Sequence, residues 1–155
     1  MKTHLKTLVT LFSILLATNQ IIAQDATSAH KDSLEIVVKK YYDLNLIVFQ
    51  ANSMVEDIDK IFELFTEDFT YVHPKYGGTY IREDLYNGYI RNQKNGRYDG
   101  TAVDIEITNK IAGLNAVVVE RAYIDKINNK IIKRDPQMTF FEFKKGKISR
   151  IFEYW

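Results

Sequence analysis

The spacing of apolar residues is mostly helical in the first part of this chain and alternating in the rest, and that difference limits the possible folds more than any other feature. Up to about residue 94, apolar side chains mostly recur at the i, i+3, i+4 spacing of a helix, whereas from residue 103 they alternate with polar ones. Two helices, a short strand, a third helix and then a series of strands are an α+β order. The length of 155 residues suits a single domain.

Three segments carry the helical pattern. The first runs from residue 34 to about residue 51. The second, residues 58–65, places its apolar residues at i, i+3, i+4 and i+7, and residues 66–68 are expected to end it. The third covers residues 82–94, where Gly88 is unfavourable because glycine lowers helix stability.

Alternating segments predict strands at residues 69–73, 103–107, 117–125, 131–143 and 147–155. After the first strand, Pro74 and the glycine pair at 77–78 predict a loop or a small hairpin. The asparagine pair at 128–129 predicts a tight hairpin turn, because asparagine tolerates a positive φ. Pro136 interrupts the fourth strand and predicts a bulge or a sheet edge there.

The N-terminal segment has the pattern of a secretory signal peptide. Lys2 and Lys6 supply positive charge, residues 8–16 form an apolar run, and residues 21–23 form a plausible cleavage site. The run is shorter than the roughly 20 apolar residues that span a bilayer. We therefore expect residues 1–23 to be removed on export to the periplasm or beyond.

This division leaves residues 24–32 as a polar, flexible leader and residues 33–155 as one domain. Residues 1–23 hold two of the chain's 21 basic residues and none of its 20 acidic ones, so the remainder is close to neutral. A near-neutral charge gives no general attraction to nucleic acid or anionic lipid. We therefore predict neither a nucleic-acid partner nor a stable membrane association after signal removal.

The residue inventory excludes several kinds of chemistry. Cysteine is absent, so the chain has no disulfide, thiol nucleophile or thiolate metal site. Two of the three histidines, His4 and His30, lie in the signal peptide and the leader, which leaves too few ligands for a predicted metal site. The chain contains no phosphate-binding loop, dinucleotide fingerprint or serine-hydrolase elbow. No cofactor is therefore predicted.

A sheet of long antiparallel strands that covers three helices tends to curl and to leave a hollow against them. We therefore predict three N-terminal helices packed on a curved, mostly antiparallel sheet that encloses a pocket, in a cone-shaped α+β barrel. The ten Tyr, nine Phe and one Trp suit both a core and a cavity wall.

The order of elements and three sequence segments resemble the nuclear transport factor 2-like (NTF2-like) superfamily. The segments are DIDKIFELF at 57–65, EDFTYVHP at 67–74 and GKISRIFEYW at 146–155, and the resemblance extends over residues 33–155. This superfamily includes ketosteroid isomerases and SnoaL-like polyketide cyclases. The resemblance implies the cone-shaped fold with its pocket, but one fold can host many unrelated activities.

The resemblance to ketosteroid isomerases implies three site positions. Their aspartate base stands just before a proline, and His73 occupies that position here. Tyr42 is the nearest match to their oxyanion-binding tyrosine, and Thr139 lies near the position of their second, protonated aspartate. The complete set of groups is therefore not reproduced, which argues against steroid isomerisation.

We expect His73, Glu153 and Tyr42 to be the candidate catalytic residues. A histidine can act as a general base near neutral pH, and a nearby carboxylate would favour its charged form. If Trp155 faces inward, strand periodicity places Glu153 on the same face. Two alternatives remain open: His73 bonds to the backbone or faces solvent, and Glu153 pairs with a basic residue at the rim.

Arg121 is the one charged residue among the inward-facing positions of residues 117–123, and it points toward the predicted hollow. It either holds a ligand carboxylate or phosphate, or Asp135 neutralises it across the hairpin. The full predicted ligand-binding set is Tyr71, Tyr89, Arg121, Tyr123, Gln137, Thr139, Phe141, Ile151 and Trp155.

Three functions are consistent with these features: binding of a small, partly apolar molecule, an isomerase, cyclase or dehydratase that uses His73 as base, and a dimeric structural or interaction domain. A deep cavity joining the histidine, the glutamate and the arginine would favour catalysis. An aromatic cavity would favour binding, and a filled one would favour interaction. Val118, Ile124 and Phe140 on the outer sheet face suggest a homodimer through the sheet.

Overall fold

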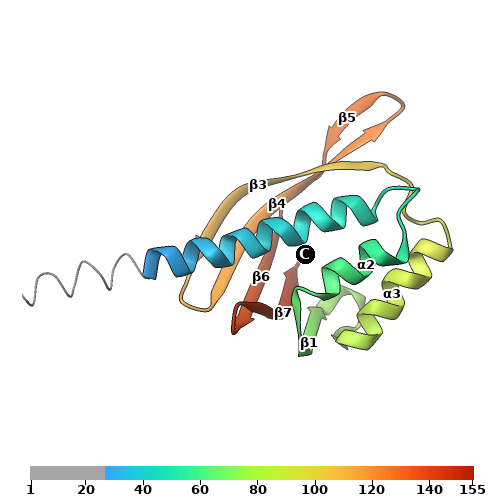
Figure 1. Ribbon diagram of the computed structural model, residues 1–155. Coiled ribbons are helices and arrows are strands. Elements are labelled where there is room, and N and C mark those ends of the chain that lie inside the picture. Colours follow the sequence, from blue (N-terminus) through green and yellow to red (C-terminus); the bar gives the residue numbers. More distant parts are fainter. Residues whose placement is uncertain (1–26) are drawn as a thin grey trace, which may run out of the picture.

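The computed structural model describes residues 27–155, so the predicted signal peptide lies outside the described residues. An N-terminal helix covers residues 27–48 of this part, and it is followed by α2 (Val55–Phe62) and α3 (Arg82–Lys94). The N-terminal helix runs along the curved sheet, and α2 and α3 lie together near its C-terminal end (Figure 1). None of the helices described is long and apolar enough to cross a membrane.

The helix is longer at its start than the sequence pattern indicated. Residues 27–32, which were expected to belong to a flexible leader, are helical. Residues 27–29 are exposed, so this turn of helix has no apolar face for periodicity to detect. The His30 ring nitrogen Nε2 lies 2.7 Å from the Leu114 carbonyl oxygen, which ties this end of the helix to the β3–β4 connection.

Seven strands form one sheet, which is curved and mostly antiparallel as predicted, although the sequence pattern predicted five strands and a loop or small hairpin. The seven strands are β1 (Phe65–His73), β2 (Gly78–Ile81), β3 (Ala102–Ala112), β4 (Ala116–Ile127), β5 (Lys130–Lys133), β6 (Gln137–Lys144) and β7 (Lys147–Tyr154). The strand order is β2-β1-β7-β6-β4-β3, with β5 paired to β4 outside this path. Only β1 and β7 pair in parallel among these strands.

The boundary between α2 and β1 differs from the prediction. The helix ends at Phe62 and the strand already begins at Phe65, so residues 66–68 are part of a strand and do not end the helix. Between paired positions, β1 advances from residue 65 to residue 70 while β7 advances only from 148 to 150. This bulge hid the strand from a search for strict alternation. It leaves the Phe65 and Phe69 rings stacked in the core, with centroids 3.9 Å apart.

Other turn signals were read correctly. Asn128 and Asn129 have φ angles of 51° and 62° and connect β4 to β5 as a tight turn. The predicted strand 131–143 is interrupted around Pro136, and it forms two strands, β5 and β6. β5 and the end of β4 project from the sheet as a hairpin arm (Figure 1). A short 3-10 turn, Pro74–Tyr76, connects β1 to β2 in the predicted hairpin.

Aromatic side chains fill the layer between the helices and the sheet. Tyr41 from the N-terminal helix packs against Phe141 of β6, with ring centroids 5.4 Å apart. Phe62 of α2 makes an edge contact with Phe65 at 5.1 Å and with Tyr89 of α3 at 5.8 Å. The N-terminal helix, α2 and α3 are therefore fixed on the sheet through one continuous aromatic core.

Candidate functional site

The inner face of β4, β6 and β7 carries a buried polar network centred on Glu153. One carboxylate oxygen, Oε2, accepts hydrogen bonds from Thr139 Oγ1 at 2.8 Å and Trp155 Nε1 at 2.7 Å. Arg121 Nη2 lies 3.4 Å from the same oxygen, and Arg121 Nη1 donates to Gln137 Oε1 at 2.5 Å. We call Arg121, Gln137, Thr139, Glu153 and the Trp155 indole N–H the floor network.

Arg121 is charged and neutralised within this network. Its side chain is 2% exposed, and its guanidinium lies 4.6 Å from the centre of the Tyr123 ring. Burial lowers the pKa of Arg121, but interactions with neighbouring phenols and with Glu153 outweigh burial and raise the pKa above its usual value. Arg121 is therefore paired within the protein, and not free for a ligand anion, which was the other alternative left open for it.

Asp135, the expected alternative partner of Arg121, forms no ion pair with any residue of the part described. The carboxylate near the hairpin that is paired is Asp125. It accepts two hydrogen bonds from Arg134, at 2.6 and 2.9 Å. Arg121 is neutralised inside the protein, but its partner is Glu153 on β7 and not Asp135 between β5 and β6.

A cavity of about 640 Å³ opens beside the floor network, between β1, β2, α3 and the end of β7, and we call it the mouth cavity. Half of the fourteen lining residues are Phe, Tyr or Trp: Phe49, Tyr71, Tyr76, Tyr80, Tyr89, Tyr98 and Trp155. The polar side chains of the lining are those of His73, Asp84, Arg91, Asn92 and Arg97. A size of this order and a lining rich in aromatic residues are typical of small-molecule sites.

His73 is buried in the wall of this cavity without a polar partner. It is 2% exposed, and neither ring nitrogen forms a hydrogen bond with the described residues. Its ring packs against Tyr76 and Trp155, with centroid distances of 4.3 and 4.4 Å. Burial lowers the pKa of His73, although the charge of Glu153 opposes this effect. The imidazole is therefore neutral at pH 7 and offers one donor and one acceptor.

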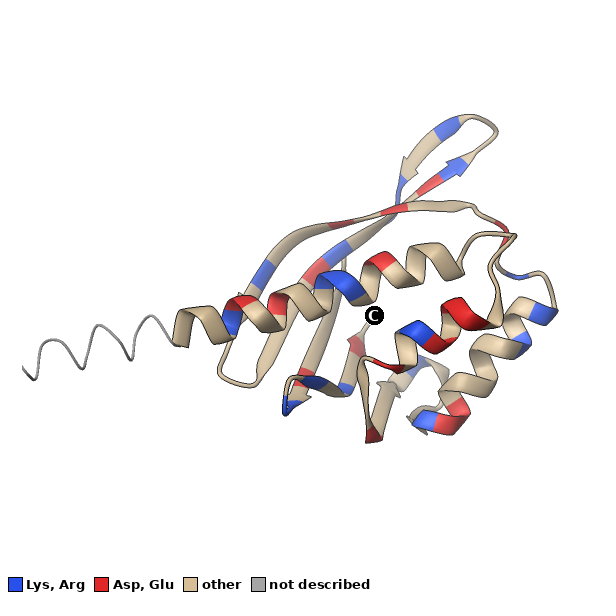
Figure 2. Cartoon of the chain, in the orientation of Figure 1, with Lys and Arg blue, Asp and Glu red and all other residues tan. Residues whose placement is uncertain are grey.

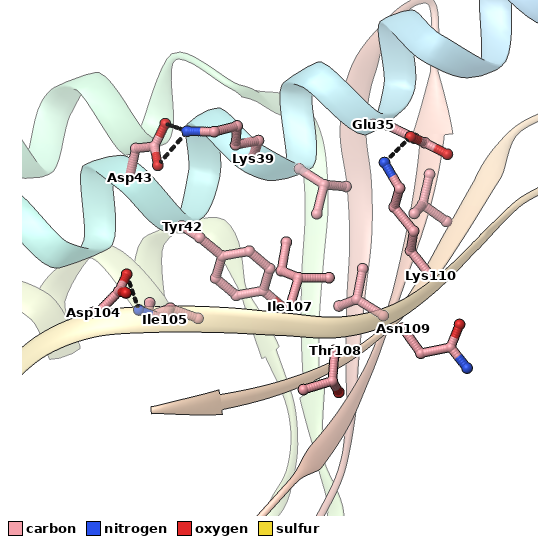
Figure 3. Close-up of a pocket in the computed structure, with 13 residues that line it drawn as sticks. Glu35, Lys39, Tyr42, Asp43, Asp104, Ile105, Ile107, Thr108, Asn109 and Lys110 are labelled. Carbon is pink, nitrogen blue, oxygen red and sulfur yellow. Dashed lines mark hydrogen bonds and ion pairs between the residues drawn. The ribbon is translucent and has the colours of Figure 1, made fainter. Parts of the chain in front are cut away.

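The three candidate catalytic residues do not meet. Trp155 packs on His73 and donates to Glu153, so it stands between them, and no hydrogen bond or ion pair joins the two. Tyr42 lines a different hollow, of about 610 Å³, between the N-terminal helix and β3 (Figure 3). Its hydroxyl is buried beside Thr139 without a hydrogen bond of normal geometry, and burial raises the pKa of Tyr42.

Two ion pairs lie along the edge of the hollow between the N-terminal helix and β3. Figure 3 shows Lys39 paired with Asp43 and Lys110 paired with Glu35 along its edge, and the Lys39–Asp43 distance is 2.6 Å. These pairs engage four of the five charged side chains in the lining of the hollow, and the fifth, Asp104, accepts a hydrogen bond from the Ile105 backbone N–H at 2.8 Å. We therefore take the mouth cavity, where polar groups lack partners, as the candidate site.

The structure divides the predicted ligand-binding set into three groups. Tyr71, Tyr89 and Trp155 line the mouth cavity. Arg121, Gln137 and Thr139 belong to the floor network, and Tyr123 packs on the Arg121 guanidinium. Phe141 and Ile151 are fully buried in the core. The Tyr89 hydroxyl donates to Asn45 Oδ1 at 2.6 Å, so its ring contributes to the wall while its hydroxyl is already bonded.

Sequence reasoning predicted Tyr89 on α3 as a site residue, but it missed the other contributions of this helix and of the loop after it. Gly88, Arg91 and Arg97 line the mouth cavity, and none was among the predicted site residues. The signal was present, because Gly88 was the one unfavourable residue in the third helix. A Cβ atom built on Gly88 meets nothing within 4 Å, so the glycine leaves open space at the cavity wall. Within residues 27–155, no group of acidic and histidine side chains could hold a metal ion.

Comparison with known proteins identifies the fold. No protein-family model and no curated protein sequence matches the chain. Among solved structures, Bal32a from a soil-derived mobile gene cassette has a TM-score of 0.56 and 18% identity, over 81% of this chain and 90% of that protein. The epoxide hydrolase/cyclase-like enzyme SalBIII, with a role in pyran ring formation in the polyether salinomycin, has a TM-score of 0.55 and 21% identity, over 80% and 91%.

A putative ketosteroid isomerase from Kribbella flavida has a TM-score of 0.54 and 16% identity, over 80% of this chain and 78% of that protein. Identities at this level establish the fold and leave the activity open. The chain has the NTF2-like fold, which ketosteroid isomerase-like and SnoaL-like polyketide cyclase proteins share.

Proposed function

We propose that this protein is an exported NTF2-like domain that binds a small, partly apolar molecule in the mouth cavity. The observation that carries the proposal is a cavity of about 640 Å³ with seven aromatic side chains in its wall and a buried histidine without a partner. Apolar surface and aromatic faces provide affinity, and one or two polar groups that lack partners provide orientation. His73 is the group that would orient the ligand.

Binding is favoured over catalysis because the polar groups needed for acid–base chemistry are occupied or distant. Glu153 already accepts three donors, and Tyr42 lines the other hollow. A catalytic base is ordinarily oriented by a hydrogen-bonding partner, and no described residue bonds to either ring nitrogen of His73. His73 therefore acts in this proposal as a hydrogen-bonding residue and not as a base.

The neutral, apolar dye N-phenyl-1-naphthylamine tests the proposal. The chain has a single tryptophan, Trp155, and it lies in the cavity wall, so energy transfer from this residue to the dye reports binding at the mouth. We expect saturable transfer in the wild type. The Gly88→Leu substitution should abolish it, because the new side chain fills open space in the cavity.

Asn87→Leu is the matched control, because it adds the same side chain to the exposed position next to Gly88. It should leave dye binding unchanged. The proposal is wrong if the wild type shows no saturable transfer, or if Gly88→Leu and Asn87→Leu bind the dye equally well.

Export is part of the proposal and rests on the pattern of residues 1–23. Expression of the full chain in a host with a secretory pathway should deliver the protein outside the cytoplasm. N-terminal sequencing of the exported product should then begin near Gln24. Recovery of exported protein that still begins at Met1 would contradict the proposed signal peptide.

We also propose a homodimer through the outer face of the sheet. Ile111, Met138 and Tyr154 on that face are 69%, 43% and 52% exposed, beside the stacked rings of Phe152 and Tyr154. An apolar patch of this kind on an uncovered sheet is typical of a protein interface. Light scattering should give twice the monomer mass, and Met138→Glu should halve it. Met54→Glu, at another exposed methionine, should not.

A further inference from the structure

Two arginines at the mouth cavity lack an anionic partner. Arg91 lies in the last turn of α3 and Arg97 in the loop that follows, and both line the cavity. Neither forms an ion pair with any residue that the structure describes. Figure 2 shows basic residues gathered at this end of α3. Arg97 Nη1 donates a long hydrogen bond, of 3.5 Å, to the side-chain oxygen of Asn92.

The other four arginines of the chain each form an ion pair or a hydrogen bond with a backbone carbonyl. Arg121 and Arg134 are paired with buried carboxylates, and Arg150 is paired with Glu142 at 3.4 Å. Arg82 donates to the Phe62 carbonyl oxygen at 3.1 Å. The two arginines of the mouth are therefore exceptional in this chain.

The helix dipole offers an ordinary reason for a cation in the last turn of α3, because the C-terminal end of a helix carries partial negative charge. Lys94 already meets that need from the same turn, and it does not line the cavity. The dipole does not explain why Arg91 and Arg97 both face the cavity.

The remaining charges at the mouth also favour an anion. The one carboxylate in the lining, Asp84, accepts a hydrogen bond from the Ile81 backbone N–H at 3.3 Å at the opposite end of α3. Lys75 adds a further cation at the rim, with its Nζ 5.8 Å from the centre of the Tyr76 ring and 5.9 Å from that of Trp155. Three cations therefore surround the mouth, against one carboxylate that is already bonded.

From these contacts we infer that the mouth cavity binds a small organic carboxylate, with the carboxylate between Arg91 and Arg97 and a flat apolar body against the aromatic wall. This inference rests on the proposed binding function and names the class of ligand. Guanidinium groups bind carboxylates through two parallel hydrogen bonds, which fixes the orientation of the ligand. Asp84 adds one negative charge to the same lining, and this charge repels a doubly charged phosphate ester more than a singly charged carboxylate.

Gly88 and His73 complete the site. Gly88 lies one helical turn before Arg91 on α3, and its missing side chain lets a flat body lie against the helix backbone. The two ring nitrogens of His73 are buried and lack a partner among the described residues, so a hydroxyl or carbonyl group on the ligand body would bond to them where it displaces the Tyr76 or Trp155 ring. The arginines and His73 lie at separate places in one cavity, so together they would select both the charge of the ligand and the pattern of its substituents.

Three probes with the same body and different head groups test the inference: 3-phenylpropanoate, 3-phenylpropan-1-ol and 3-phenylpropylammonium. Titrations followed by calorimetry and by Trp155 fluorescence should show the carboxylate binding at least about tenfold more tightly than the alcohol. The ammonium should bind most weakly. Added salt should weaken carboxylate binding and leave alcohol binding unchanged, because salt screens exposed charges.

Substitutions locate the effect. Arg91→Gln with Arg97→Gln should lower carboxylate affinity about tenfold to the level of the alcohol and leave alcohol affinity unchanged. The matched control, Lys94→Gln, removes a positive charge from the same turn of α3 outside the cavity. It should change neither affinity by more than about twofold.

The outcomes separate this inference from the proposed function. If the dye and the alcohol bind but the carboxylate gains nothing, or if Lys94→Gln acts like the double substitution, the carboxylate assignment is wrong and the binding function stands. Tighter binding of 3-phenylpropyl phosphate than of the carboxylate would also overturn the assignment. If neither the dye nor any of these probes binds, the proposed function itself fails.

Discussion

The floor network and the mouth cavity differ in how their polar groups are satisfied, although they share Trp155. In the floor network, each of the two opposite charges has its partner: Glu153 accepts three donors and Arg121 holds both Glu153 and Gln137. At the mouth, His73 is buried without a partner, and Arg91 and Arg97 lack an anion. The unpartnered His73 therefore lowers the stability of the fold at the mouth, since a buried polar group without a partner is destabilising.

This difference distinguishes polar groups that stabilise the fold from polar groups that can bind a ligand. In the floor network the two opposite charges neutralise each other, and Arg121 Nε is the one atom of the pair that is buried without a hydrogen-bond partner among the described residues. The buried His73 lacks a protein partner within residues 27–155, whereas Arg91 and Arg97 are exposed and would exchange water for a ligand. We therefore expect substitutions in the floor network to lower stability strongly, and substitutions at the mouth to change binding with small or favourable effects on stability.

The largest effect is expected at Glu153. Glu153→Gln leaves the buried Arg121 guanidinium without a counter-charge and should lower the free energy of unfolding by about 3–5 kcal/mol. Urea denaturation measures this change. Glu142→Gln, which breaks an exposed pair with Arg150 on neighbouring strands, is the control and should cost less than about 1 kcal/mol. Equal costs would mean that the floor network is not a buried ion pair.

A pH-dependent effect is expected at His73. Because burial lowers its pKa in the folded state, the unfolded chain, with a histidine pKa near 6.5, binds the proton first as pH falls. Stability should therefore fall as pH drops from about 7 through the folded pKa, and this loss should level off below it. Urea denaturation at several pH values should show a shallower slope for His73→Gln. A slope identical to that of the wild type would mean that His73 is solvated.

A smaller effect, of opposite sign, is expected at Gly88. Alanine is a better helix former than glycine, and a Cβ atom at this position meets only open space. Gly88→Ala should therefore raise the free energy of unfolding by about 0.5–1 kcal/mol while narrowing the mouth cavity. Thermal unfolding measures the gain in stability, and the dye titration measures the loss of affinity that a narrower cavity should cause. Loss of stability would show that the cavity wall is closed at this helix.

The smallest effect on stability is expected at the two arginines of the mouth. Arg91→Gln and Arg97→Gln should each change the free energy of unfolding by less than about 0.5 kcal/mol, because neither side chain has an ion pair to lose. Urea denaturation in low salt measures the change. A loss above about 1 kcal/mol in either variant would place that arginine with the floor network and remove the contrast between the two regions.

Several site features could be read from the sequence because they depend on local periodicity. Alternation along β7 placed Ile151 and Glu153 on the inner face, and both are buried there. The same reasoning placed Arg121 inside on β4. The partner of Arg121 could not be read, because Glu153 is more than thirty residues away and reaches it only across β6.

The sequence by itself determined the order of helices and strands, the turns at 128–129 and Pro136, and which side chains face inward, because these follow from the period of apolar residues and from backbone preferences. Only the tertiary structure decided which inward polar groups are paired. It assigned Arg121 and Glu153 to each other, placed Tyr42 in another hollow, and left His73 without a partner. Pairing across a curved sheet depends on strand order and register, which single-chain periodicity does not encode.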